Sequence, residues 1–145
     1  GLLDYPQTAG GCMLTDPGYS ARLRELRDHE GLDDLRAVMR LRIGRHFRLG
    51  RARLIVGRDV VENGALEKDV AAGECLIRPL SAPGPTAILT DSFASPEMAT
   101  ALSVCARHCR GRADRIVRFE IVGAGARREA EAEAVAEPAL NALRI

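Results

Sequence analysis

The sequence is poor in aromatic residues and contains no long apolar run. Phe, Trp and Tyr make up only 3% of its 145 residues, which argues against a broad surface on which several bases could stack. No apolar run approaches the roughly 20 residues that a membrane-spanning helix requires. The N-terminus also lacks a basic segment followed by an apolar one, so the sequence predicts neither a secretory signal nor a membrane partner.

Cysteine occurs at four positions, but the spacing of these residues does not indicate a disulfide framework. Reduced thiols and a cytoplasmic location are therefore expected. Cys105 and Cys109 would share one face of a helix with His108 nearby, but that helix is otherwise apolar and no fourth zinc ligand is evident. We predict no metal. The chain also lacks a glycine-rich pyrophosphate loop, so we expect no nucleotide cofactor within it.

The length and an apolar fraction of 46% suit one domain with its own core. Residues 1–18 are rich in Gly, Pro and Thr and are predicted to be a linker, while residues 19–145 form the domain. Periodicity and turn residues predict helices from about residue 17 and over 33–39, 58–73 and 95–109, and strands over 45–49, 52–57, 74–80, 85–90 and 114–123. Residues 128–137 have a helix-favouring composition but a strict period of two, and we assign them to an edge strand. The predicted fold class is α+β, a single domain with a mixed or antiparallel sheet packed with helices.

Positive charge is concentrated in one segment, although the formal net charge of the chain is only +1. No Asp or Glu lies between residues 36 and 58, but eight arginines do: Arg36, Arg40, Arg42, Arg45, Arg48, Arg51, Arg53 and Arg58. Guanidinium groups match phosphate oxygens, and His46 and Phe47 within the segment could stack on an unpaired base. The alternative is a solvated basic face balanced by carboxylates across the sheet, and charge alone does not decide between the two.

Three stretches occur in a suggestive order and spacing: IGRHFRL (43–49), LIVGRDVVENGAL (54–66) and PGPTAIL (83–89). Together they resemble the NFACT-type RNA-binding domain, in the version found at the C-terminal end of bacterial tRNA thiouridylase-like proteins. Those proteins also carry an N-terminal PP-loop ATPase domain, and residues 4–26 resemble the junction between the two parts. One departure is Asp59, where the family usually has Asn after the Gly-Arg pair.

The resemblance implies a function in RNA binding. The RNA-facing residues that the resemblance indicates are Arg45, His46, Arg48 and Arg58, with Asn63 close by. The charge and stacking arguments add Phe47, Arg51 and Arg53 to the predicted RNA-facing set. Gly44 and Gly57 would allow the backbone to turn sharply beside these residues. The implied partners are tRNA and an N-terminal PP-loop domain of the same protein, which would bind ATP and thiolate a uridine. The parent would then be an ATP-dependent tRNA sulfurtransferase, its sulfur donor is not indicated, and this fragment alone would have no activity.

Cys12 is a second candidate, because it lies in the glycine-rich stretch AGGCMLTDP (9–17) where a thiol could stay exposed. A cysteine persulfide is one form of sulfur nucleophile that can attack an activated base, and nearby arginines would favour the reactive thiolate. A role as a metal or iron–sulfur ligand, or no role at all, is equally open. Two alternatives to a pure RNA-binding module therefore stand: Cys12 makes the segment part of a thiolation site, or the basic face docks an acidic protein.

Overall fold

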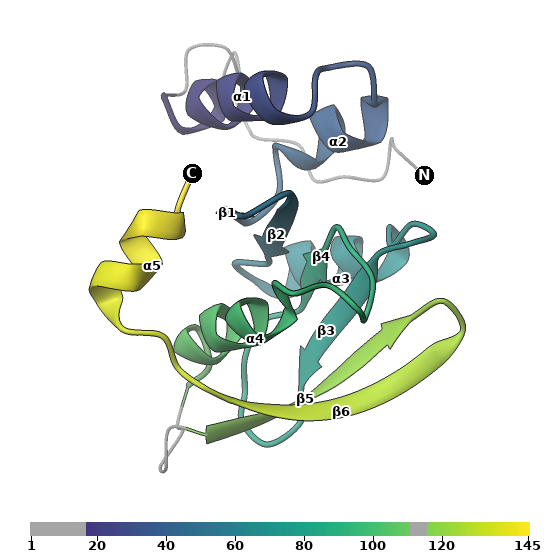
Figure 1. Ribbon diagram of the computed structural model, residues 1–145, viewed down its shortest axis with the longest axis vertical. Helices are drawn as coiled ribbons and strands as arrows, with labels where there is room; N and C mark the ends of the chain where they lie inside the picture. Colours follow the sequence, from purple (N-terminus) through teal and green to yellow (C-terminus); the bar gives the residue numbers. More distant parts are fainter. Residues whose placement is uncertain (1–16, 111–115) are drawn as a thin grey trace.

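The centre of the structure is a six-stranded sheet in the order β1-β2-β4-β3-β5-β6, with every neighbouring pair antiparallel (Figure 1). This computed structural model describes residues 17–110 and 116–145. The strands are β1 (Arg45–Leu49), β2 (Ala52–Val56), β3 (Cys75–Pro79), β4 (Ala87–Leu89), β5 (Ile116–Gly123) and β6 (Ala126–Glu133). The described helices are α1 (Pro17–His29), α2 (Leu35–Arg40), α3 (Val60–Lys68), α4 (Met98–Arg107) and α5 (Glu137–Leu143).

The core has two layers because helices cover both faces of the central strands. Leu54 and Val56 of β2 pack on the side of α4, while Ile55 between them packs on the side of α3, where Leu66 is buried. Successive side chains of a strand point to opposite faces, so a strand covered on both sides is apolar throughout. All five residues of β2 are accordingly buried.

Two smaller parts of the structure pack against β1 and β2. Helices α1 and α2 form a separate lobe at the top of Figure 1, with their own apolar cluster around Tyr19, Leu26 and Leu41. After α5 the chain returns to the edge strand β1, where the Ile145 backbone amide donates to the His46 carbonyl at 3.0 Å. The C-terminus therefore covers one edge that would otherwise expose unpaired backbone groups.

The fold confirms the predicted α+β class and shows that the sheet is antiparallel. An edge strand, β6, is present where the period of two predicted one, but it covers 126–133 instead of 128–137, and Glu137 already belongs to α5. Helix α4 begins later than expected: Glu97 occupies its N-cap without a side-chain hydrogen bond, and the Ser95 hydroxyl instead accepts from the Glu97 amide. Helix α5 was not predicted. Of the expected linker, Pro17 and Gly18 lie in α1, and residues 1–16 lie outside the described residues.

Within the described part of the chain, no helix is both long and apolar enough to cross a membrane.

Candidate nucleic-acid interface

A hollow of about 440 Å³ opens where the start of β1, the β2–α3 loop, the β3–β4 loop and the end of α4 meet. It is lined by Arg45, Gly57, Arg58, Asp59, Val60, Asn63, Pro83, Gly84, Pro85, His108 and Arg110. We call it the arginine pocket, after Arg45, Arg58 and Arg110. The pocket draws residues from all three stretches that carried the family resemblance, although these stretches are far apart in the sequence.

Arg45 and Arg110 are exposed cations on this lining. Neither guanidinium has a hydrogen bond or an ion pair to any other residue in the ranges 17–110 and 116–145. The position of Arg110 is fixed through its backbone, because its amide donates to the Pro83 carbonyl at 2.8 Å and ties the end of α4 to the β3–β4 loop. Two cations are thus held at the pocket by backbone structure while their charged ends face solvent.

Arg58 is oriented by a buried carboxylate. Its Nη2 and Nε donate to Glu62 at 2.8 and 2.9 Å, and its backbone amide donates to the same side chain at 2.9 Å. Burial alone would raise the pKa of Glu62, but the hydrogen bonds from Arg58 and from the Gly44 amide lower it overall. Glu62 therefore stays ionised, and it holds a guanidinium that is still about half exposed (47%) at the pocket.

Asn63 joins two walls of the pocket. Its Oδ1 accepts from the Thr86 amide at 3.1 Å, while the Gly57 amide donates to the Thr86 carbonyl at 2.9 Å. A Cβ on Gly57 would collide with the Asn63 side-chain oxygen, so this position admits only glycine without a shift. The side-chain amide nitrogen of Asn63 has no hydrogen-bond partner among the described residues and is available to a ligand.

His108 closes the pocket on the side of α4. Its Nδ1 donates to the Val104 carbonyl at 3.0 Å, which leaves Nε2 as the second ring nitrogen, and its ring meets Phe47 edge-on at 5.9 Å between centroids. Burial lowers the pKa of His108, and the charges of Arg45, Arg144 and Arg107 lower it further. The unliganded side chain is therefore neutral at pH 7, and an anion in the pocket would favour its protonation.

A different set of arginines from the same segment is buried. Arg40 and Arg53 are each 4% exposed in their side chains and Arg48 14%, and we call these three the buried arginine cluster. Arg40 donates to Asp69 at 2.9 Å and to Glu74 at 2.7 Å. Carboxylates from elsewhere in the chain therefore neutralise these cations inside the fold.

Glu25 of α1 balances the other two members of the cluster. Arg48 donates to it at 2.8 Å and Arg53 pairs with it as well, and Arg48 also reaches Glu30 at 2.8 Å. Burial would raise the pKa of Glu25, but its hydrogen bond to Arg48 and the charges of both arginines lower it overall. These ion pairs attach the α1–α2 lobe to the sheet.

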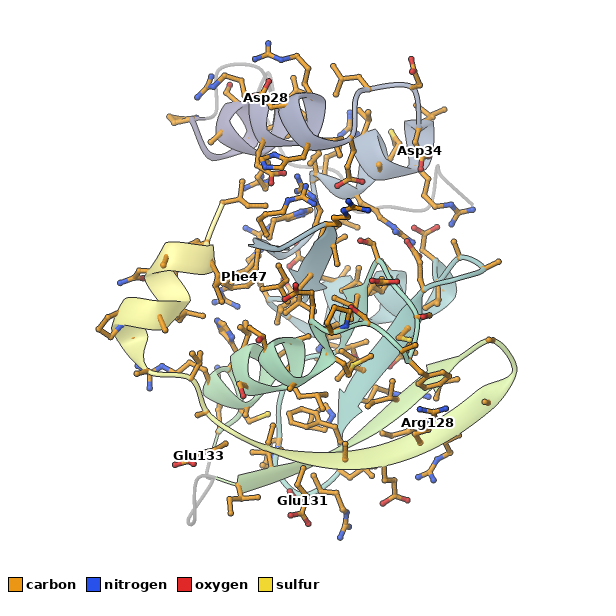
Figure 2. All side chains as sticks on the ribbon, in the orientation of Figure 1. Asp28, Asp34, Phe47, Arg128, Glu131 and Glu133 are labelled. Atoms are coloured by element: carbon orange, nitrogen blue, oxygen red, sulfur yellow. The ribbon has the colours of Figure 1, made fainter. Side chains whose placement is uncertain are left out.

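This placement corrects part of the predicted RNA-facing set. His46 is 2% exposed and Phe47 is fully buried, so neither ring can stack on a base; Phe47 is labelled in Figure 2. The His46 Nδ1 accepts from Arg53 at 2.7 Å, and its Nε2 donates to the Ile43 carbonyl at 2.8 Å. Burial and the charge of Arg53 lower the pKa of His46 far below its usual range. Arg53 is also almost fully buried, and its guanidinium is engaged by His46 and Glu25.

The remaining predicted residues divide between the pocket and other places. Arg45, Arg58 and Asn63 line the pocket, whereas Arg48 belongs to the buried cluster and Arg51 is exposed in the β1–β2 turn. Since Arg45 pairs with Val56 at the far end of the hairpin, the turn lies at the opposite end from the pocket.

The prediction missed two pocket residues at the end of α4, His108 and Arg110. Their sequence signal is a histidine and an arginine just before Gly111, and this pattern by itself suggests only a metal ligand. The loop prolines Pro83 and Pro85 lie in a stretch that marked the family, but nothing in their sequence pattern placed them beside Arg58.

Cys12 lies outside the described residues. Cys75, Cys105 and Cys109 are buried, and burial raises the pKa of Cys75 and Cys105. The Cys109 thiol donates to the Cys105 carbonyl. In the described ranges, no group of three or more His, Cys, Asp or Glu side chains is arranged to hold a metal ion.

Comparison with known proteins identifies the family of this domain and a solved structure with a similar fold. The family model described as NFACT protein RNA binding domain matches residues 44–142, a range that includes every residue lining the arginine pocket. Among solved structures, the C-terminal part of the fibronectin/fibrinogen-binding protein from Streptococcus suis is similar, with a TM-score of 0.61 and 16% sequence identity. The match covers 92% of this chain and 64% of that one. A search of curated proteins found no match.

Proposed function

We propose that this chain, which belongs to the family of NFACT protein RNA binding domains, binds RNA by holding a backbone phosphate in the arginine pocket. The observation that carries the proposal is the convergence of Arg45, Arg58 and Arg110 on one hollow, two of them without an acidic partner in the described ranges. Such cations bind phosphate strongly because they do not first have to break an existing ion pair.

The size and lining of the pocket suit a piece of a single strand. Its volume of about 440 Å³ lies within the range of roughly 300 to 1,000 Å³ for small-molecule sites, which is room for a nucleotide and not for a duplex. Val60, Pro83 and Pro85 add apolar surface beside the arginines, against which a sugar or base can lie. The Asn63 side-chain amide and the His108 ring nitrogen supply further hydrogen bonds.

Fluorescence anisotropy with a labelled tRNA and with a labelled single-stranded RNA tests this proposal. Arg45→Ala and Arg110→Ala should each weaken binding and reduce the magnitude of the slope of log K against log salt by about 0.7 for each lost phosphate contact. Arg51→Ala is the matched control, because it removes an exposed arginine of the same segment away from the pocket. Equal losses for all three variants, or no loss for the pocket variants, would contradict the proposed site.

We propose further that the RNA is tRNA and that the domain presents it to a PP-loop ATPase domain in a longer cytoplasmic protein. The resemblance of residues 4–26 to the junction of thiouridylase-like proteins supports this step. ATP would bind to that other domain, and Cys12 would take part in sulfur transfer. In the parent protein, Cys12→Ser should lower the thiolated nucleosides in bulk tRNA while leaving tRNA affinity unchanged; normal thionucleoside levels would remove Cys12 from the mechanism.

A further inference from the structure

The arginine pocket contains a carboxylate as well as its cations. Asp59 lies on the lining, where it is the N-cap of α3, and one of its oxygens accepts from the Glu62 amide at 2.8 Å. The side chain is exposed, and its second oxygen has no hydrogen-bond partner within residues 17–110 and 116–145. A negatively charged acceptor therefore shares the lining of the pocket with Arg58.

This carboxylate is unfavourable for an anion that brings no proton donor. Two negative groups held close together repel, and each also loses hydration when the pocket is filled. A ligand that carries a hydroxyl next to its phosphate turns that acceptor into a favourable contact, because a hydrogen bond to a charged acceptor is among the stronger ones. The pocket is thus built for a ligand in which an anionic group and a donor are neighbours.

A ribonucleotide has this arrangement. Its 2′-hydroxyl and its 3′-phosphate are on adjacent carbons of the ribose, so a phosphate bound by Arg58 brings the hydroxyl into the same pocket that Asp59 lines. A deoxyribonucleotide has the phosphate without the hydroxyl, and the 2′-hydroxyl is the group by which proteins distinguish RNA from DNA at a given site. Base edges also carry donors, but they lie farther from the phosphate than the hydroxyl does.

We infer that Asp59 makes the arginine pocket selective for RNA over DNA by accepting a hydrogen bond from a ribose 2′-hydroxyl whose phosphate the arginines bind. This inference rests on the proposed function, since it assumes a phosphate in the pocket. The two carboxylate oxygens of Asp59 then have different roles: one caps α3, and the other accepts the hydrogen bond from the ribose 2′-hydroxyl.

The test compares three 12-nucleotide oligouridine probes on the full chain: ribose, 2′-deoxyribose and 2′-fluororibose. The fluoro sugar keeps an RNA-like pucker but cannot donate a hydrogen bond, so it separates shape from chemistry. The variants are Asp59→Ser and Asp59→Asn, because both residues can still cap α3. The hydroxyl of serine is too short to replace the second carboxylate oxygen, whereas asparagine places a donor where the acceptor was.

The wild-type chain should bind the ribose strand about tenfold more tightly than the fluoro strand, the scale of one hydrogen bond to a charged group. Both Asp59 variants should bring that ratio close to one, largely because the deoxy and fluoro strands bind better once the repulsion is gone. An unchanged ratio in Asp59→Ser would overturn the inference, and so would a wild-type ratio of one with binding that still depends on Arg45 and Arg110. Binding that does not depend on those arginines would instead refute the proposed function itself.

Discussion

The buried arginine cluster and the arginine pocket come largely from the same stretch of sequence but serve opposite purposes. Arg40, Arg48 and Arg53 are enclosed and bonded to carboxylates. In the pocket, Arg45 is exposed without a partner among the described residues. A run of like charges is therefore not a measure of surface charge, because the balancing groups lie outside the run. Whether an arginine can bind a ligand is therefore decided by the carboxylates that it meets in the fold, and not by its position in the sequence.

The largest difference between the two sets of arginines is expected in stability, when a buried arginine is removed. Arg53→Ala leaves Glu25 short of a partner and His46 without its donor, so the free energy of unfolding should fall by about 3 kcal/mol or more. Urea unfolding followed by circular dichroism measures the change. Arg45→Ala should cost less than about 0.5 kcal/mol, since it removes only an exposed side chain. Similar losses of stability in both variants would show that the buried arginine cluster and the arginine pocket do not differ in how they contribute to the fold.

The walls of the pocket depend on Gly57. In Gly57→Ala the new methyl group would displace the Asn63 side chain and break its bond to the Thr86 amide, at a cost of about 1 to 3 kcal/mol. RNA affinity should fall as well, because the β2–α3 and β3–β4 loops would separate. Gly64→Ala is the matched control in α3, where a Cβ meets nothing within 4 Å. Equal behaviour of the two variants would contradict the role assigned to Asn63.

The buried cluster should also show itself in the pH dependence of stability. The pKa of His46 is far below its usual value in the folded chain, so below about pH 6.5 the unfolded chain takes up a proton that the folded chain does not. Stability is therefore lost as the pH falls, by about 1 kcal/mol between pH 7 and 5.5 for this one residue. The pH dependence of His46→Gln should be weaker by that amount. Identical profiles would mean that His46 accepts a proton in the folded chain.

The smallest effect is expected on the outer side of β6. Glu131 and Glu133 point away from the body of the protein in Figure 2, and no ion pair of theirs is found among the described residues. Replacing both with Gln should tighten RNA binding less than threefold at low salt, by reducing long-range repulsion. The gain should vanish near physiological salt, where the screening length is about 8 Å. A gain that survives there would indicate that RNA approaches this strand directly.

The alternation of apolar and polar residues and the positions of turn residues were sufficient to predict the strands, because both can be read from a short stretch of sequence. Both failed where distant residues decide. Ile116, in the strand predicted over 114–123, is 48% exposed, because it lies on the face of β5 opposite to the buried Val117 and Phe119. Helix α5 has only seven residues and no side-chain cap, and it is held by burying Leu140 against the core around α4. A short segment of this kind carries little helical signal of its own.

The candidate site was predictable only in part for the same reason. Arg45, Arg58 and Asn63 were identified through a family resemblance, whereas His108 and Arg110 reach the pocket because α4 ends beside the β3–β4 loop. Burial of Arg53 could not be foreseen, since Glu25 lies 28 positions earlier in the chain. Sequence distance hides such pairs, and charge counting within a window assigns their arginines to the surface.

The most direct test of the difference between the buried arginine cluster and the arginine pocket is an RNA titration followed at the arginine Nε–Hε resonances by NMR. Each guanidinium gives its own signal, so the two sets can be observed in one sample without any substitution. The signals of Arg45, Arg58 and Arg110 should shift in proportion to bound RNA, while those of Arg40, Arg48 and Arg53 stay in place. Shifts of equal size in both sets, or shifts confined to Arg51 in the turn, would contradict the account.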